Sequence, residues 1–294
     1  MGAATLDPAS RLTCRLECGS RALSLAGPRV MGILNLTPDS FSDGGRFSAG
    51  AGSGTVDLGR VRAAAEEMLA AGADILDIGG ESTRPGAAPV AESEELGRVM
   101  PAIEALLELD TILSVDTRKA GVARAALAAG VQMINDVSAL DDPLMLEVLA
   151  QSSAAVCLMH MQGEPATMQQ QPQYDDVVGT VRDFLEERVA RCVAAGIGPQ
   201  RICIDPGFGF GKRLTHNLTL LRGLASVRVR DLPILVGLSR KRMIGDLTGR
   251  GPEQRLAGSV AAALLAVEQG ANIVRVHDVA ATVDALKVLD ALTS

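Results

Sequence analysis

The stretch that decides the fold is TILSVDTRKAGVARAALAAGVQMIND, residues 111–136. An apolar, partly β-branched run at 111–116 predicts a strand, and the Ala- and Arg-rich segment at 118–129 predicts a helix. Gly130 stands directly before a second strand-like run at 131–135, where a glycine can end a helix by adopting a positive φ. A strand, a helix and another strand in so short a stretch indicate a βαβ unit of a parallel sheet.

The same unit repeats on both sides of this stretch. Candidate strands lie at 30–35, 74–78, 111–116, 131–135, 154–159, 201–205, 233–237 and 272–276. Helical patterns lie at 57–71, 92–109, 118–129, 142–151, 176–195, 214–223, 253–269 and 278–291. Strand–helix pairs in this number, in a chain of 294 residues, predict a (β/α)8 barrel, although a doubly wound open sheet gives the same alternation. We expect one domain over 30–294, preceded by an extension over 1–29 that could form a small hairpin.

Composition excludes several classes of protein. The net charge of −7 argues against nucleic acid as the main partner, because phosphate-backbone binding needs concentrated basic charge. No stretch approaches the ~20 apolar residues of a membrane span, and the N-terminus lacks the apolar region of a secretory signal. The five cysteines are dispersed and Cys14 with Cys18 cannot build a zinc site alone, so we expect reduced thiols in a cytoplasmic protein. His160 has no Cys or His at ligand spacing, so a packed histidine is expected there.

Polar residues follow nearly every predicted strand, at the end where a (β/α)8 barrel builds its active site. A single such residue usually caps the next helix, and Asp136 and Asp278 have this simpler interpretation. Several polar ends converging on one rim are better explained by a polar ligand, which Asp116 and Asn135 should face because their strands are otherwise apolar. The other polar strand ends are Asn35, Asp77, His160, Asp205, Ser239, Arg275 and His277.

Two segments after the first strands look like substrate loops. Segment 31–45, MGILNLTPDSFSDGG, contains the Pro, Asp, Ser and Gly residues of a long shaped loop and carries Phe41, which an ordinary surface turn would not need. Segment 79–87, GGESTRPGA, offers two hydroxyls and a guanidinium within a few residues, although a glycine-rich turn by itself is weak evidence of a site.

Two later segments also favour ligand binding. Segment 205–212, DPGFGFGK, alternates Gly with Phe, so its backbone can approach a ligand while its phenyl rings wall a flat one. Its spacing fits neither a dinucleotide fingerprint nor a P-loop. Segment 237–245, GLSRKRMIG, is basic and follows the seventh strand, where this fold often binds phosphate. A solvated basic run is the alternative, but Arg275 and His277 on the next strand favour an anion site.

Taken together, these segments resemble the dihydropteroate synthase family, from about residue 30 to the C-terminus. The most specific stretches are LNLTPDSFSDGG (34–45) and DIGGESTRPGA (77–87). Further matches are SVDT (114–117), INDV (134–137), MHMQG (159–163), IDPGFGFGK (204–212), GLSRK (237–241), RLAGS (255–259) and RVHDV (275–279).

The resemblance implies a (β/α)8 barrel that is usually a homodimer. It also implies a cytoplasmic transferase of folate biosynthesis, which condenses 6-hydroxymethyl-7,8-dihydropterin diphosphate with 4-aminobenzoate to 7,8-dihydropteroate and diphosphate. Mg²⁺ would assist the reaction, and sulfonamides would compete with aminobenzoate. Two alternatives are a barrel that transfers a methyl group from methyltetrahydrofolate and a non-catalytic pterin-binding paralogue. Neither has a reason to keep all of the diphosphate and aminobenzoate segments intact.

The resemblance also assigns roles by motif. Asp116, Asn135, Asp205 and Lys241 would line the pterin pocket. Asn35, Arg275 and His277 would hold the diphosphate, with Asn35 also reaching Mg²⁺. The aminobenzoate side would consist of Ser82, Thr83, Arg84, Pro85, Phe41, Phe210 and Ser239, and Asp77 and Glu81 would support the loop after the second strand. Catalysis would depend on Asp116, Lys241, Arg275 and His277.

The few aromatic residues fit this interpretation. The chain has five Phe, one Tyr and no Trp, which an aliphatic barrel interior can accommodate. Phe41 and Phe210 lie in loops where two flat substrates would need walls. Phe47 and Phe208 lie near the same loops but could equally be packing residues.

Overall fold

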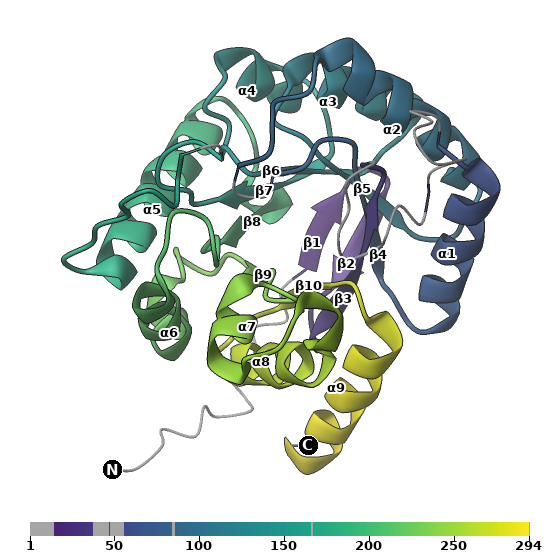
Figure 1. Ribbon diagram of the computed structural model, residues 1–294. Coiled ribbons are helices and arrows are strands. Elements are labelled where there is room, and N and C mark those ends of the chain that lie inside the picture. The colour runs from purple at the N-terminus through teal and green to yellow at the C-terminus, as the bar shows by residue number, and fades with distance from the viewer. Residues whose placement is uncertain (1–14, 38–46, 48–55, 84–85, 166, 294) are drawn as a thin grey trace.

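The chain forms a closed barrel of parallel strands surrounded by helices (Figure 1). The computed structural model describes residues 15–37, 47, 56–83, 86–165 and 167–293. Within these residues the barrel strands are β3 (Arg29–Asn35), β4 (Ile75–Gly79), β5 (Ile112–Asp116), β6 (Met133–Asp136), β7 (Ala155–Met159), β8 (Ile202–Asp205), β9 (Leu235–Val236) and β10 (Ile273–Val276). Their order is β8-β7-β6-β5-β4-β3-β10-β9, and a parallel bridge between Ile204 and Ile234 joins the two ends. The predicted (β/α)8 barrel is confirmed, and the doubly wound alternative is wrong.

The helices pack around the outside of the strands (Figure 1). They are α1 (Leu58–Ala70), α2 (Glu92–Leu106), α3 (Ala120–Ala129), α4 (Pro143–Ala150), α5 (Val177–Ala194), α6 (Leu214–Arg222), α7 (Arg242–Thr248), α8 (Leu256–Glu268) and α9 (Val279–Thr293). Helix α7 begins within segment 237–245, where we expected no helix, and Gly249 ends it with φ 69°. The helix expected from residue 253 begins at Leu256, because Pro252–Gln254 forms a short 3-10 helix. Among the described residues no helix is long and apolar enough to span a membrane.

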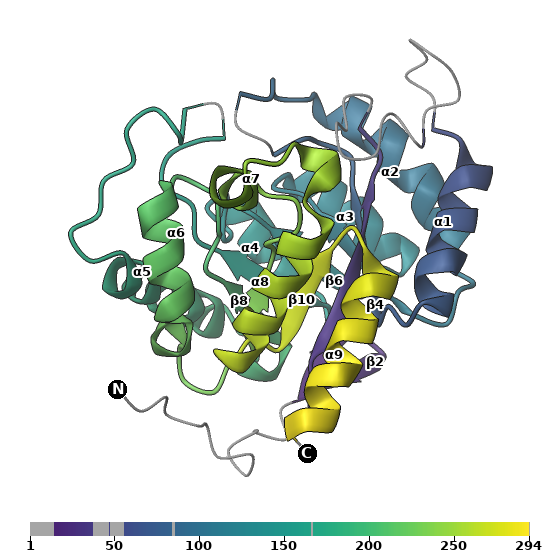
Figure 2. The same ribbon diagram turned by 60° about the horizontal axis from the view of Figure 1, so that its bottom comes forward.

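A two-stranded hairpin covers the N-terminal ends of the barrel strands. It consists of β1 (Arg15–Cys18) and β2 (Arg21–Ser24), paired antiparallel; Figure 1 shows it within the outline of the barrel, and Figure 2 shows β2 at the lower end of the strands. Apolar residues of the hairpin and of the strand starts form one buried cluster: Leu16, Cys18, Leu23, Leu25, Met31, Ile75, Ile112, Met133, Ala155, Cys157, Cys203, Leu235 and Ile273. With that end filled by side chains, the polar strand ends lie at the opposite, C-terminal end.

The larger core lies between the strands and the helices and is mainly aliphatic. Phe208 is fully buried in this core, and Phe47 is almost fully buried there. Both are therefore packing residues, which decides the alternative that the sequence left open. The predicted role of Phe41 lies outside the described residues, together with those of Arg84 and Pro85.

Candidate active site

Residues from four strands meet at the C-terminal end of the barrel. Arg275 of β10 donates from Nε to Asp77 Oδ2 of β4 at 2.6 Å and from Nη2 to Asp116 Oδ2 of β5 at 2.9 Å. Asn135 of β6 donates from Nδ2 to the same Asp77 oxygen at 3.1 Å. Asp77, for which the sequence predicts a supporting role at the loop after the second strand, lies at the centre of this cluster. Tertiary pairing thus brings together carboxylates, an amide and a guanidinium that lie far apart in the sequence.

The cluster has hydrogen-bonding capacity that the described residues do not use. Asp77 Oδ1 and Asp116 Oδ1 are buried and accept no hydrogen bond from any described residue. Buried carboxylate oxygens in this state are uncommon, so a donor-rich ligand is the natural partner. Gly79 lies beside them, because a Cβ there would be in van der Waals contact with Asn35 Oδ1 at 3.5 Å and with Asp116 Cβ at 3.8 Å. Asn35, Gly79 and Asp116 therefore lie next to one another at this end of the barrel.

Burial and neighbouring charges shift the pKa values of Asp116 and Arg275 in opposite directions. Burial raises the pKa of Asp116 to about 7, although the positive charge of Arg275 acts to lower it. Burial would by itself lower the pKa of Arg275, but Asp77 and Asp116 raise it above its ordinary value, so the guanidinium stays charged. Arg275 is therefore the positive charge that makes two adjacent buried carboxylates tolerable.

Lys241 and Asp205 lie at the ends of β9 and β8. Lys241 precedes α7 directly, and its Nζ donates to the carbonyl oxygen of Phe208 and lies 4.4 Å from the ring centroid of Phe210. Burial lowers the pKa of Lys241 to about 8, while Asp205 acts to raise it. Burial also raises the pKa of Asp205, which Lys241 opposes. The ammonium, the carboxylate and the exposed edge of an aromatic ring thus share one side of the barrel mouth.

Ser239 and His277 form a third group at the ends of β9 and β10. Ser239 Oγ lies 3.0 Å from His277 Nδ1 and accepts the His277 backbone N–H at 3.2 Å. Arg240, next in sequence, has φ 56° and forms a two-pronged ion pair with Asp278, at 3.0 Å from Nε and 2.6 Å from Nη2. Arg240 therefore ties the two strand ends together. Of the basic residues at 240–242 only Lys241 joins the site, because Arg242 is exposed and pairs with Asp246.

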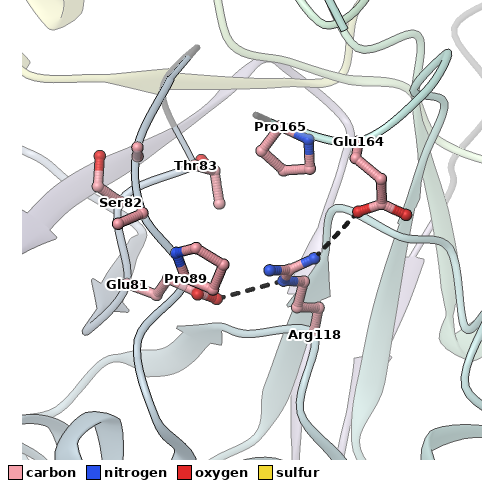
Figure 3. Close-up of a pocket in the computed structure, with 9 residues that line it drawn as sticks. Glu81, Ser82, Thr83, Pro89, Arg118, Glu164 and Pro165 are labelled. Atoms are coloured by element: carbon pink, nitrogen blue, oxygen red, sulfur yellow. Dashed lines mark hydrogen bonds and ion pairs between the residues drawn. The ribbon is translucent and has the colours of Figure 1, made fainter. Parts of the chain in front are cut away.

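The loop after β4 is fixed at its base by ion pairs. Glu81 accepts the Val90 backbone N–H at 2.9 Å, Lys119 Nζ at 2.9 Å and Arg118 Nε at 3.3 Å. Burial would raise the pKa of Glu81, but these hydrogen bonds hold it below its ordinary value. Arg118 also reaches Glu164 at 3.3 Å, so it lies between the two carboxylates (Figure 3).

Ser82 and Thr83 lie on the wall of a cavity of about 230 Å³ beside these ion pairs (Figure 3). The cavity is lined by Glu81, Ser82, Thr83, Ala87, Ala88, Pro89, Arg118, Glu164 and Pro165. The predicted loop residues Ser82 and Thr83 thus border an open space, but no hydrogen bond joins them to the Asp77–Asp116–Arg275 cluster.

Lys212 is a buried residue that the sequence analysis did not single out. Its Nζ lies 2.9 Å from Nδ1 of His160, which is buried against the ring of Phe184 as a packed histidine should be. Burial and, to a smaller extent, the charge of the neighbouring Lys212 together lower the pKa of His160 to about 2. One feature of the sequence could have identified Lys212. It ends the Gly/Phe segment 205–212, and no acidic residue lies three or four positions away to pair with it.

Gly207, at the start of that loop, is expected to tolerate no side chain. Its φ is 69°, and a Cβ there would lie 1.9 Å from the carbonyl oxygen of His160. We expect Gly207→Ala to lower the free energy of unfolding by about 3 kcal/mol, as measured by denaturant titration. Gly97→Ala is the matched control, because Gly97 is exposed in α2 with open space around it and should gain slightly. Equal stability of the two variants would contradict the described loop geometry.

Among the described residues no group of three or more His, Cys, Asp or Glu side chains is arranged to hold a metal ion. The side chain of Asn35 forms no hydrogen bond with another described residue, and its Oδ1 lies beside Gly79. Any metal at this rim would therefore take few of its ligands from the described side chains.

Comparison with known proteins places these features in context. Residues 31–277 match the family model described as pterin binding enzyme. Over 281 residues the chain is 50% identical to the dihydropteroate synthase of Escherichia coli (strain K12), covering 95% of this chain and 97% of that one. A Yersinia pestis dihydropteroate synthase structure with a sulfonamide drug complex superposes with TM-score 0.89 at 49% identity, covering 95% and 98% of the two chains. A Xanthomonas albilineans dihydropteroate synthase structure with 4-aminobenzoic acid has TM-score 0.87 and 51% identity, covering 96% and 99%.

Proposed function

This chain belongs to the pterin binding enzymes and, within them, to the dihydropteroate synthases, and on that premise we propose how its residues perform the reaction. The reaction condenses 6-hydroxymethyl-7,8-dihydropterin diphosphate with 4-aminobenzoate, giving 7,8-dihydropteroate and diphosphate. It is a transferase reaction of folate biosynthesis. The observation that carries the assignment of residues is the Asp77–Arg275–Asp116 cluster. Asp77 Oδ1 and Asp116 Oδ1 are buried there and accept no hydrogen bond from the described residues.

The pterin would bind at the C-terminal end of the barrel, between the side chains of Asp116, Asn135, Asp205 and Lys241. The aminopyrimidinone ring presents several N–H donors along one edge, and carboxylate oxygens accept such donors. Asp116 Oδ1 is buried without a partner among the described residues, so it is available for this edge. Lys241 Nζ would donate to the pterin carbonyl oxygen, since its present acceptor is only a backbone carbonyl at the same rim.

The diphosphate would lie against Arg275, His277 and Asn35. Arg275 carries a fixed positive charge in a buried setting, where charge–charge interactions are strong. His277 is held by Ser239 at the neighbouring strand end, so its ring is oriented before the substrate arrives. These groups would stabilise the negative charge that grows on the departing diphosphate, a preorganised role that can contribute several kcal/mol.

Mg²⁺ fits this site as a companion of the diphosphate. Mg²⁺ keeps several waters and is usually held by one or two protein oxygens plus substrate phosphates. The amide oxygen of Asn35, which lies beside Gly79 at the same end of the barrel as Asp116, suits one such position. When bound, the ion would add positive charge beside the phosphate oxygens.

The bond change needs little proton transfer from the protein. The bond between the pterin methylene carbon and the diphosphate oxygen breaks, and the electron-rich ring stabilises the resulting positive carbon. The lone pair of the aminobenzoate nitrogen then forms the new C–N bond, and that nitrogen loses one proton. Asp116 and neighbouring oxygens would stabilise the cationic pterin, while Arg275 and His277 hold the leaving group. An aromatic amine is already nucleophilic at neutral pH, so neither a covalent enzyme intermediate nor a strong base is required.

Aminobenzoate would bind nearer the mouth of the barrel. The side chains proposed for it are Phe41, Ser82, Thr83, Arg84, Pro85, Phe210 and Ser239. The ring of Phe210, held beside Lys241, offers a flat wall for the arylamine. Solved relatives carry 4-aminobenzoic acid or a sulfonamide drug, which supports a shared arylamine subsite in this chain and competition by sulfonamides.

We further propose that the protein works as a cytoplasmic homodimer. The described cysteines are buried and form no disulfide, as expected in a reducing compartment. Leu247 of α7 and Leu256 and Leu265 of α8 expose large apolar side chains on the last helices, which supports pairing through that face.

The decisive test mixes the pure protein with dihydropterin diphosphate, Mg²⁺ and 4-aminobenzoate, and measures diphosphate release and dihydropteroate formation. We expect release that requires aminobenzoate and falls when Mg²⁺ is chelated. A sulfonamide should raise the apparent KM for aminobenzoate. Absence of aminobenzoate-dependent release would instead favour a methyltransferase-type barrel or a non-catalytic pterin-binding protein.

A further inference from the structure

The loop after β8 has an unusual hydrogen-bond pattern. Each of its five successive carbonyl oxygens, from Gly207 to Gly211, accepts a hydrogen bond from a side chain. The donors are Lys212 to Gly207 at 2.9 Å, Lys241 to Phe208, Gln169 to Gly209 at 2.5 Å, Lys212 to Phe210 at 3.1 Å and Tyr174 to Gly211 at 2.9 Å. Side chains therefore help to hold the direction of all five carbonyl groups in this loop.

Lys212 supplies two of these five contacts from inside the protein. The residue is only 2% exposed, and its Nζ also contacts His160 Nδ1 at 2.9 Å and the His160 carbonyl oxygen at 3.4 Å. It forms no ion pair with any carboxylate of the described residues, and burial lowers its pKa well below the ordinary value. The charge of Asp205 acts to raise that pKa, but the hydrogen-bond partners of Lys212 are all neutral, and such a buried lysine is costly unless it fixes something that the protein needs.

The glycines of the loop make such fixing necessary. Gly207, Gly209 and Gly211 have φ values of 69°, 81° and 60°, so the backbone adopts conformations that other residues rarely reach. Within the loop, Phe210 N–H donates to the Gly207 carbonyl at 3.1 Å. With three glycines in the loop, the peptide planes would be held less firmly if their side-chain donors were removed.

The direction of these peptides matters at the barrel mouth. The carbonyls of Gly207 and Phe210 point inward to Lys212, whereas the Phe208 carbonyl between them accepts from Lys241 on the substrate side. The ring of Phe210 lies against the same Lys241, at 4.4 Å from Nζ. Lys212 therefore holds the carbonyls on both sides of the Phe208 carbonyl, and among the described residues no hydrogen bond joins Lys212 to Lys241.

We propose that Lys212 is a positioning residue of the reaction: by holding the carbonyls of Gly207 and Phe210 inward, it sets the Phe208 carbonyl and the Phe210 ring against Lys241 and so shapes the arylamine wall. The proposal rests on the proposed aminobenzoate subsite. It assigns no contact with substrate to Lys212, which follows β8. Lys241, which follows β9, is by contrast proposed to bind the pterin.

The test is Lys212→Met, which keeps the length of the side chain and removes its donors. We expect the KM for aminobenzoate to rise about tenfold, the effect of losing one charge-assisted hydrogen bond, with a smaller change in the KM for dihydropterin diphosphate. Lys212→Gln, which retains N–H donors, should show an intermediate effect and serves if the Met variant folds poorly. Lys287→Met is the matched control, because Lys287 is exposed on α9 and should leave both constants unchanged.

A second measurement reports the loop directly. The chain contains no Trp, so Phe210→Trp places a single Trp, which can be excited selectively over Tyr174, in the arylamine wall. Adding Lys212→Met or Lys212→Gln to this variant should shift the emission to longer wavelength and increase quenching by acrylamide. A folded Lys212 variant with an unchanged aminobenzoate KM and unchanged emission would overturn the proposal. Failure of the proposed subsite is distinguishable, because Phe210→Ala would then also leave the aminobenzoate KM unchanged.

Discussion

Arg275→Met should reduce kcat by about a thousandfold, the largest effect expected of any substitution in this chain. Arg275 contributes twice. Its guanidinium would stabilise the departing diphosphate, and in the absence of substrate it neutralises Asp77 and Asp116 through bonds of 2.6 and 2.9 Å. Methionine fills a similar volume but supplies no charge, so the transition state loses its stabilisation and both carboxylates lose their counter-charge.

The measurement is single-turnover diphosphate release at saturating substrates, which separates chemistry from product release. Arg242→Met is the matched control, because Arg242 is 86% exposed on its side chain and pairs only with Asp246 at 3.6 Å among the described residues. Since Arg275 lowers the pKa of Asp116, its removal should also raise that pKa further. An Arg275→Met enzyme with kcat within tenfold of wild type would remove Arg275 from the chemical step.

Asp116→Asn should lower kcat/KM for dihydropterin diphosphate by about a hundredfold, the equivalent of roughly 3 kcal/mol for a buried hydrogen bond to a charged group. The amide keeps the shape of the side chain. However, it presents N–H groups or a single neutral oxygen where the pterin edge needs a charged acceptor. Asp183→Asn is the control, because Asp183 lies exposed on α5 and pairs only with its neighbour Arg182 among the described residues.

The pH profile of kcat/KM provides the sharper readout of Asp116. The ionised carboxylate is the form that accepts hydrogen bonds from the pterin, and burial raises its pKa to about 7. Wild-type kcat/KM should therefore fall as the pH drops through that value and level off above it. Lys241, whose pKa burial lowers to about 8, must stay protonated to donate, so kcat/KM should fall again above that pH. Asp116→Asn should lose the acid limb and keep the alkaline limb; an unchanged acid limb would contradict the assignment.

The barrel could be predicted from the sequence because its strands are short apolar runs bounded by glycines and polar ends. The expected strand at 111–116 is observed at Ile112–Asp116, and the expected helix at 118–129 is observed at Ala120–Ala129. Helix α7 was missed because it has only seven residues and lies in a basic segment bounded by glycines. So short a helix shows no clear apolar periodicity, and its formation depends on packing against its neighbours.

The candidate site was only partly predictable, for a different physical reason. The barrel topology brings polar strand ends such as Asp116 and Asn135 to one rim, and their sequence positions are enough to predict that. Which of them pair depends on side-chain rotamers across strands: Arg275 contacts Asp77, 198 residues earlier in the chain. The central place of Asp77 and the buried contacts of Lys212 therefore became visible only in three dimensions.

Because of the hairpin of β1 and β2, the two ends of the barrel differ in how well they tolerate substitutions. Its leucines fill the N-terminal end together with Met31, Ile75 and their neighbours, so substitutions there act on the stability of the whole barrel. Loops at the open end, such as the one carrying Ser82 and Thr83, contribute little to that cluster. Selection by a competing drug can therefore change the arylamine specificity of the C-terminal loops, while the hairpin at the N-terminal end keeps the barrel stable.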